Sequence, residues 1–275
     1  MNTINALVDQ STASRSAFIQ ELTPTALQGR TPAAFADTAH PSTSPTYSFL
    51  PTQRVLDALA LAGFVPVGAA QARSRPDRRF AARHVIRLRR RYETVQLTDS
   101  IPEIVFINGH DGRTASQFRL GLHRVACTNG LIVSVGPVPV WRFPHRSEIL
   151  DDVVAAVLQQ SELFAQVGAF VERMERTVLE EPQRMAMADQ ALSLRFAPKR
   201  RGSLEPSQLL TVRRPEDVGH DLWRTYNVIQ ENVLRGGLSR RSASNRLTRT
   251  RSITSIREDV RINTALWAMA IALAH

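Results

Sequence analysis

The sequence predicts an α+β fold, with an antiparallel β-sheet in the N-terminal half packed against a helical C-terminal half. Between residues 64 and 143, apolar residues alternate with polar ones along short segments, which is typical of strands. Two of these segments flank the Gly- and Asp-rich loop at 109–113, as the arms of an antiparallel hairpin do. From residue 147 the apolar residues recur at helical spacing instead, and such helices bury their apolar sides against a sheet or against one another.

Residues 1–50 are rich in Ser, Thr, Ala, Gln and Pro and show no sustained apolar period. A segment of this kind buries too little apolar surface to offset the entropy lost on ordering. We therefore expect a disordered arm over residues 1–50 and a single α+β domain over 51–275. Within that domain, residues 51–146 form the β-rich half and residues 147–275 form the helical half.

The β-rich half begins with a helix from Pro51 to Gly63, because Pro is tolerated in a first helical turn and Gly favours a helix C-terminus. Extended segments follow, separated by turns rich in Gly, Asp, Asn and Pro, and they lie at 64–67, 84–92, 103–108, 116–127 and 131–135. Pro137 and Pro139 restrict the next segment, 138–142, to a sheet edge.

The helical half begins at Ser147, a favourable N-cap residue followed by acidic residues that suit the positive end of the helix dipole. Apolar stripes at helical spacing predict helices over about 148–174, 182–194, 204–210, 217–235 and 253–274. Residues 238–252, between the last two helices, are dense in Ser, Thr and Arg. We expect them to form a loop.

The net charge of the chain is +10, and its positive charge is concentrated in two blocks. Residues 72–147 contain 14 basic and 5 acidic residues, residues 199–275 contain 14 and 7, and the segment between them is acidic. Such a distribution indicates a polyanionic partner, with nucleic acid ahead of an anionic membrane surface. Arg is used almost to the exclusion of Lys, but codon bias in a GC-rich genome has the same effect, so this preference says little about function.

The strand at 84–92 offers the clearest candidate surface for phosphate groups. Because successive side chains of a strand point to opposite faces, Arg87, Arg89 and Arg91 share one face at a spacing of about 7 Å. Ile86 and Leu88 on the other face should anchor the strand to the core and leave the arginine face outward. Further candidate phosphate contacts come from the strand at 116–127 and the loop at 238–252, namely Arg119, Arg240, Arg241, Arg246, Arg249 and Arg251.

The chain lacks the sequence motifs of familiar catalytic and metal sites. It has no glycine-rich phosphate loop, no HExxH and no nucleophile elbow. The best metal candidates are His110, Asp111, His123 and Cys127, but on one strand His123 and Cys127 would lie about 13 Å apart, too far for one ion. We therefore expect no metal, no cofactor and no catalytic residue, and keep an enzyme as an open alternative.

No segment is expected to enter a membrane. The N-terminal residues MNTINALVDQ lack the basic start and apolar core of a secretory signal. The most apolar stretch, Thr264–Ala274, is too short for a bilayer, which needs roughly 20 apolar residues. The lone cysteine, Cys127, excludes an intramolecular disulfide. These features predict a cytoplasmic protein.

Three segments together resemble one bacterial family. They are PTQRVLDAL at 51–59, PEIVFINGHDGRTASQFRLGLHRVACTNGLIV at 102–133, and 222–270, which begins LWRTYNVIQENVLRGG. Their order and spacing are similar to those of the domain-of-unknown-function 932 family, whose members are carried largely by plasmids, phages and integrated elements. The first family motif is matched by Asn108, His110, Asp111, Gly112, Cys127, Asn129 and Gly130, and the second by Asn227, Gln230, Glu231, Asn232, Gly236, Gly237, Asn263 and Trp267. The resemblance implies mobile-element upkeep, in replication, recombination or defence evasion, and no settled activity.

Three hypotheses about function follow. The first is a non-catalytic nucleic-acid-binding protein of a mobile element, with single-stranded DNA binding or annealing as its specific form. The second is an interaction protein that binds or inhibits a host protein, in which the arginines serve docking. The third is an enzyme that uses the loop 108–113 with Asn227, Gln230 and Glu231, which requires that loop to meet their helix. The sequence leaves open DNA or RNA as the ligand, and a monomer or a homo-oligomer as the functional form.

Overall fold

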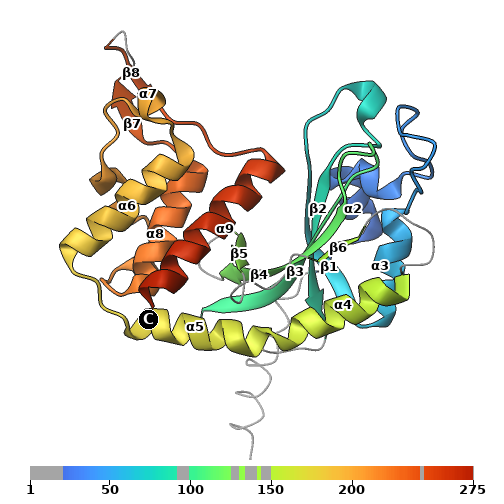
Figure 1. Ribbon diagram of the computed structural model, residues 1–275, viewed down its shortest axis with the longest axis horizontal. Helices are drawn as coiled ribbons and strands as arrows, with labels where there is room; N and C mark the ends of the chain where they lie inside the picture. Colours follow the sequence, from blue (N-terminus) through green and yellow to red (C-terminus); the bar gives the residue numbers. More distant parts are fainter. Residues whose placement is uncertain are drawn as a thin grey trace, which may run out of the picture. The chain divides into compact units, whose positions relative to one another are not determined.

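The structure is a computed structural model that describes residues 21–91, 99–124, 130–133, 141–143, 150–241 and 245–274. Its N-terminal half forms an antiparallel sheet and its C-terminal half forms helices, which confirms the predicted α+β class (Figure 1). The chain divides into two compact units. Unit 1 comprises 1–94, 103–119 and 140–159, and unit 2 comprises 95–102, 120–139 and 160–275. This division differs from the halves expected on either side of residue 147, because two strands and one helix contribute residues to both units.

The sheet follows the strand order β1-β2-β3-β4-β5, and β6 also pairs with β4. In unit 1, β1 and β2 form a long antiparallel pair, and β2 pairs with β3 from His84 opposite Asn108 to Leu88 opposite Ile104. In unit 2, the end of β4 pairs with β5. The strands lie close to the predicted segments, with bounds β1 Phe64–Gln71, β2 His84–Arg90, β3 Ser100–Asn108, β4 Ser116–Arg124, β5 Gly130–Val133 and β6 Trp141–Phe143.

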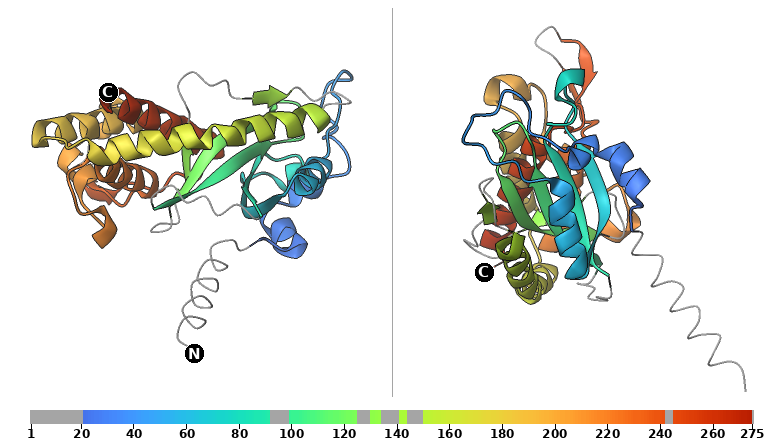
Figure 2. Two further views of the ribbon diagram at one scale, coloured as in Figure 1. Left: turned by 90° about the horizontal axis from the view of Figure 1, so that it is seen from below. Right: turned by 90° about the vertical axis from the view of Figure 1, so that its right-hand side faces the viewer.

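Helix α3 (Thr52–Leu61) covers part of this sheet in unit 1 and packs against β1 (Figure 2). It buries Val55, Leu56 and Leu59, as the apolar spacing predicts. Gly63 follows it with φ of +88°, a left-handed conformation that glycine adopts without the steric cost of a Cβ. The predicted helix at 51–63 is therefore correct in position and in its end.

Residues 21–50 are ordered, so the expected disordered arm is wrong for this part of the chain. They contain helix α2 (Pro24–Arg30) and a 3₁₀ helix, η1 (Pro32–Phe35). Leu27, Ala33 and Ala34 are buried, and the backbone N–H of Ala33 donates to the side-chain oxygen of Gln71 at 2.8 Å. The segment lacked an apolar period because its buried residues are mostly small and belong to two short helices. The rest of the predicted arm, residues 1–20, lies outside the described residues.

Removing this cover should destabilise the protein. A chain that begins at Ser48 loses α2 and η1, and burial of a leucine side chain such as Leu27 alone contributes about 1.5–3 kcal/mol. We expect it to melt at a clearly lower temperature than a chain that begins at Glu21, measured by circular dichroism. Equal melting temperatures for the two shortened chains would contradict the packing of residues 21–47.

Unit 2 is a helical bundle centred on α8 (Leu222–Arg235), which packs against three other helices, α5, α6 and α9, and against the 3₁₀ helix η3. Asp221 caps α8 by accepting a hydrogen bond from the backbone N–H of Arg224 at 2.9 Å. Aromatic rings of Trp223, Tyr226 and Trp267 meet in the core. The other helices of the C-terminal half are α4 Leu150–Glu162, most of which belongs to unit 1, and α5 Phe164–Arg176, α6 Glu181–Arg195, α7 Pro198–Arg201, η3 Pro206–Leu210, η4 Pro215–Asp217 and α9 Ile256–Leu273.

Residues 150–176 are long and apolar enough to span a membrane by length and composition, a test that core helices of soluble proteins also pass. Within this stretch, Leu163 interrupts the helix between α4 and α5. Val167, Val171 and Met174 of α5 are fully buried, and α5 packs on α8. This is the pattern of an amphipathic core helix in a soluble protein. Cytoplasmic localisation stays a prediction.

Candidate functional site

Arg87 and Arg89 on β2 are ion-paired with Glu103 on the adjacent strand β3. The two oxygens of Glu103 accept from Arg87 Nη1 at 2.8 Å and from Arg89 Nε at 2.9 Å. Arg89 is only 7% exposed and Glu103 1%. The expected outward arginine face is therefore wrong at Arg89, and Arg87 shares the single negative charge of Glu103 with Arg89. The reason is a cross-strand pair of opposite charges, which stabilises neighbouring strands and cannot be read from one strand alone.

The other predicted strand arginines also have partners. Arg91 donates to both carboxylate oxygens of Glu21 at 3.0 Å, and both side chains are nearly half exposed. Arg119 is half-buried and donates to Gln117 at 3.2 Å. A role in phosphate binding stays a prediction for all of these residues, and the arrangement supports it least at Arg87 and Arg89.

The predicted loop at 238–252 is a two-stranded hairpin. Its strands, β7 (Ser239–Arg241) and β8 (Leu247–Arg249), pair Ser239 with Arg249 and Arg241 with Leu247. Directly opposed residues share a face, so these four side chains lie on one side, and all four are exposed. We call residues 238–251 the arginine hairpin; residues 242–244 within it lie outside the described residues. It carries Arg240, Arg241, Arg246, Arg249 and Arg251.

The arginines of this hairpin differ electrostatically from those of β2. Among the described residues, no carboxylate lies within ion-pairing distance of Arg241, Arg249 or Arg251. The Arg241 guanidinium instead donates to the backbone oxygen of Asn245 at 3.2 Å. Arg246 is exposed and Arg240 is half-buried. Arg241, Arg249 and Arg251 therefore present positive charge that no described carboxylate balances and that can meet an anionic ligand.

The base of the hairpin is fixed to the end of α8. Gly236 and Gly237 have φ of +68° and +81°, and a Cβ added at Gly236 would lie 2.6 Å from the backbone oxygen of Arg251. Only glycine allows this close approach of the two chain segments at the base of the hairpin. Backbone hydrogen bonds then join Gly237 and Leu238 to Thr250, and the Arg195 side chain donates to the oxygens of Val233 and Arg251. The cationic side chains thus project from a fixed scaffold.

The first polar family motif forms a buried network in unit 1. His84 Nδ1 lies 3.0 Å from the oxygen of Ala82 and therefore donates to it, because a carbonyl can only accept. In the neutral ring His84 Nε2 is then the acceptor for the Thr52 hydroxyl, at 2.9 Å. That hydroxyl also accepts from Asn108 Nδ2 at 2.9 Å and lies 3.2 Å from His110 Nε2, which must donate to it.

This network is structural in character. His84, His110, Asn108 and Thr52 have no exposed surface, and burial lowers the pKa of His84 to about 4. Ser116 extends the network by donating to Asn108 at 3.0 Å. Asp111, also in this motif, accepts from the backbone N–H of Arg113 and shapes the loop, as Asp does in turns. Asn129 and Cys127 lie outside the described residues.

The second polar motif, on α8, forms hydrogen bonds and ion pairs with several elements of unit 2. Asn227 donates to the oxygen of Trp223, and Gln230 donates to Asn263 on α9 at 2.9 Å. Glu231 accepts from Arg214 at 3.0 Å and from Arg235 at 3.1 Å. Asn232 donates to the backbone oxygens of Leu209 and Thr211. Polar side chains on a buried helix need such partners, and the described partners of these residues lie on several different elements.

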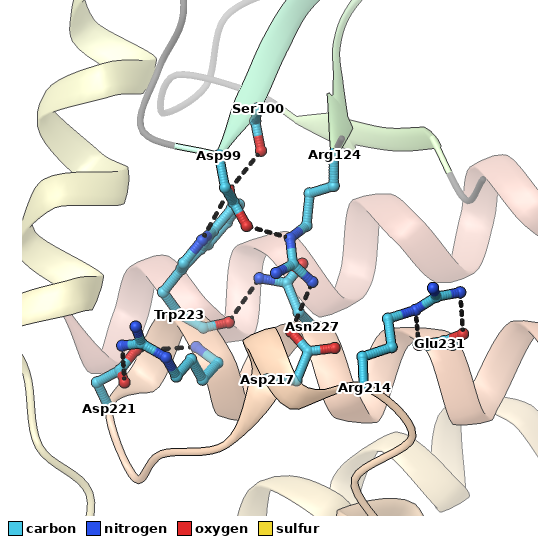
Figure 3. A network of polar contacts seen from close by, with 10 residues as sticks. Asp99, Ser100, Arg124, Arg214, Asp217, Asp221, Trp223, Asn227 and Glu231 are labelled. Atoms are coloured by element: carbon cyan, nitrogen blue, oxygen red, sulfur yellow. Dashed lines mark hydrogen bonds and ion pairs between the residues drawn. The ribbon is translucent and has the colours of Figure 1, made fainter. Parts of the chain in front are cut away.

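A third network, which the sequence did not reveal, lies in unit 2 around Arg124 (Figure 3). Its buried guanidinium donates to Asp99 at 2.6 Å and to Asp217 at 2.7 Å, and the indole N–H of Trp223 donates to Asp99 at 3.2 Å. Burial raises the pKa of Asp217, and Arg124 opposes that effect. These residues are far apart in the sequence, so no local pattern could have grouped them. They join the end of β4 to the start of α8.

The described polar residues of the two motifs lie in different units. The described partners of Asn108, His110 and Asp111 lie in unit 1, and those of the α8 residues lie in unit 2. The expected contact between the loop 108–113 and α8 therefore stays a prediction, as does the enzyme hypothesis. In the part of the chain that the structure describes, no three His, Cys, Asp or Glu residues are grouped to hold a metal ion. The expected absence of a metal or cofactor also stays a prediction.

Comparison with known proteins identifies relatives over most of the chain. Residues 39–267 match the model of the family described as Domain of unknown function (DUF932). Two proteins of Escherichia coli (strain K12), "UPF0380 protein YafZ" and "UPF0380 protein YfjQ", are each 39% identical over 246 residues, which is 88% of this chain and 88% of each relative. No solved structure matches the chain. With a family match that covers most of its length, the chain belongs to the DUF932 family.

Proposed function

We propose that this protein is a non-catalytic nucleic-acid-binding protein, that single-stranded DNA is its ligand, and that the arginine hairpin is a principal contact. One observation carries the proposal. The hairpin exposes Arg241, Arg249 and Arg251 on a fixed scaffold with no described carboxylate to balance them. Arg87, Arg89, Arg124 and Arg214, in contrast, are paired with acidic side chains.

The chemistry of the hairpin suits a phosphate backbone. Arginine presents a planar fork of donors that matches phosphate oxygens, and neutralising several phosphates releases counterions and so gives affinity. Leu247, which is 67% exposed between the arginines on the same face, adds an apolar surface that can contact an unpaired base. Contacts to phosphates and apolar contact with a base carry little sequence information, so we propose binding with little sequence preference. A role in annealing and in mobile-element upkeep is part of the same proposal.

Replacing the three arginines should weaken nucleic-acid binding without unfolding the protein. We expect the variant Arg241→Ser/Arg249→Ser/Arg251→Ser to bind labelled single-stranded DNA about tenfold to a hundredfold more weakly at about 0.1 M salt, because several phosphate contacts are lost. Fluorescence anisotropy with single-stranded DNA, single-stranded RNA and duplex DNA measures the effect and ranks the ligands.

A matched control removes the same charge elsewhere. Arg30, Arg54 and Arg113 are exposed in unit 1, and replacing all three with Ser should leave affinity within about threefold of the wild type. Equal losses for the two triple variants would indicate a nonspecific charge effect. No binding of any nucleic acid by the wild-type protein would reject the proposal in favour of the interaction-protein hypothesis, for which the exposed Leu247 would be a docking residue.

A further inference from the structure

The loop between β1 and β2 carries a second exposed cationic surface. Within residues 72–83 it contains the arginines Arg73, Arg75, Arg78, Arg79 and Arg83 and a single acidic residue, Asp77. Phe80, in the same loop, is 56% exposed. An exposed phenylalanine of this kind is unusual beside a sheet whose other aromatic side chains, such as Phe106 and Phe118, are fully buried. We call residues 72–83 the Phe80 loop.

The backbone of the Phe80 loop is held in place by hydrogen bonds at several points. The N–H of Ala72 donates to the oxygen of Arg83 at 2.8 Å, which closes the loop, and the side chain of Gln71 donates to the oxygen of Arg79 at 2.8 Å. A turn of 3₁₀ helix, η2 (Pro76–Arg78), lies between these anchors. Ala81, directly after Phe80, is 5% exposed and its N–H donates to the oxygen of Arg78. The outward position of Phe80 therefore belongs to a fixed backbone.

The charges of the loop are also available. Among the described residues, no carboxylate lies within ion-pairing distance of Arg73, Arg75, Arg78 or Arg79. The Arg79 guanidinium carbon lies 5.9 Å from the centroid of the Phe80 ring, within the range of a cation–π interaction. An aromatic face beside a guanidinium, surrounded by further cations, is the combination with which proteins bind unpaired nucleic acid.

We propose that Phe80 stacks on a base of single-stranded nucleic acid while Arg73, Arg75 and Arg78 contact the neighbouring phosphates. This inference rests on the proposed function and adds a second contact, on unit 1. Stacking of this kind favours single-stranded over duplex nucleic acid, because the faces of bases in a duplex are already covered by their neighbours. It also assigns the aromatic ring to affinity and not to sequence recognition, since every base has a π face.

The most direct test places a fluorescent ring at this position. In the full chain carrying Phe80→Trp, addition of a single-stranded oligo-dT should quench the emission of the new indole, because a stacked base quenches it, and duplex DNA should do so much less. The control is Leu61→Trp, because Leu61 is 93% exposed on α3, also in unit 1, and lies outside the loop. Its emission should not change beyond the response of the wild-type protein.

Affinity provides the second measurement. Stacking on an aromatic side chain contributes about 1–3 kcal/mol per base, so Phe80→Ala should bind the oligonucleotide roughly fivefold to a hundredfold more weakly. Because Phe80 is exposed, its circular dichroism spectrum should match the wild type, and Phe80→Trp should restore the affinity.

Failure of this inference and failure of the proposed function give different results. If the wild-type protein binds no nucleic acid, the proposed function is wrong and the inference falls with it. If the wild type binds but Phe80→Ala binds equally well and the indole of Phe80→Trp is not quenched, only the stacking role of Phe80 is wrong. If vesicles of anionic lipid shift the emission of Phe80→Trp to shorter wavelength while oligo-dT leaves it unchanged, the loop binds a membrane surface and the inference is overturned.

Discussion

Glu103→Ala should lower the free energy of unfolding by about 3–5 kcal/mol, because it leaves the buried guanidinium of Arg89 without its carboxylate. Arg87 and Arg89 both form ion pairs with this one side chain, with N···O distances of 2.7 Å for Arg89 and 2.8 Å for Arg87. A buried guanidinium that has lost its carboxylate still carries the free-energy cost of desolvation, and no ion pair offsets that cost. Urea denaturation followed by circular dichroism measures the difference.

An exposed ion pair, formed by Arg91 directly after β2 and by Glu21, provides the control. Glu21→Ala removes the partner of Arg91, but both side chains are nearly half exposed, so the loss should stay below about 1 kcal/mol. Replacing Glu103 with Gln should give an intermediate result, because the amide keeps one acceptor oxygen and loses the charge. If Glu103→Ala and Glu21→Ala destabilised the protein equally, the interpretation of Arg87 and Arg89 as structural residues would be wrong.

Acidification should destabilise the fold through His84. Burial lowers the pKa of His84 to about 4, whereas in the unfolded chain it has its ordinary value of 6.5. Above pH 6.5 neither state is protonated at this ring, and the full stability is present. Between pH 6.5 and about 4 only the unfolded state gains the proton, so stability falls as the pH falls, in total by about 3 kcal/mol. Urea denaturation across this interval measures the loss.

The variant His84→Gln isolates this contribution, because its amide oxygen can still accept from Thr52 but does not titrate. Other groups, including surface carboxylates, titrate in both proteins, so the difference between the two pH profiles belongs to the histidine. We expect the wild type to lose more stability than the variant as the pH falls below 6.5. Parallel profiles would show that His84 is not held neutral by its surroundings.

The structural elements that could be predicted are those whose side chains follow a regular period in the sequence. Alternating residues located β2, and an apolar stripe ending in Gly236-Gly237 located α8. The polar motifs could also be found, but their roles could not, because the partners of Asn108 and Asn232 are side chains and backbone groups distant in the sequence. Predicting the α+β class required only these periodic patterns of apolar residues.

The incorrect predictions share a physical cause, which is that the deciding partner lay elsewhere in the chain. Alternation placed Arg89 on the right face of its strand, but the pairing with β3 brought Glu103 to the same face. The segment 21–50 looked featureless because Ala33 and Ala34 are small, yet both are buried and their 3₁₀ helix packs against α2 and α3. The predicted loop at 238–252 is a hairpin instead, and its strands of 3 residues each are too short to show an alternating pattern in the sequence.

The central claim is that the arginine hairpin supplies phosphate contacts that the paired arginines of β2 do not. It is tested most directly by the salt dependence of single-stranded DNA binding, plotted as log affinity against log salt concentration. Each lost phosphate contact should reduce the slope by about 0.7 unit, so Arg241→Ser/Arg249→Ser/Arg251→Ser should reduce it by about 2 units. The control variant at Arg30, Arg54 and Arg113 should keep the wild-type slope. An unchanged slope in the hairpin variant would contradict the claim and place the phosphate contacts elsewhere on the protein.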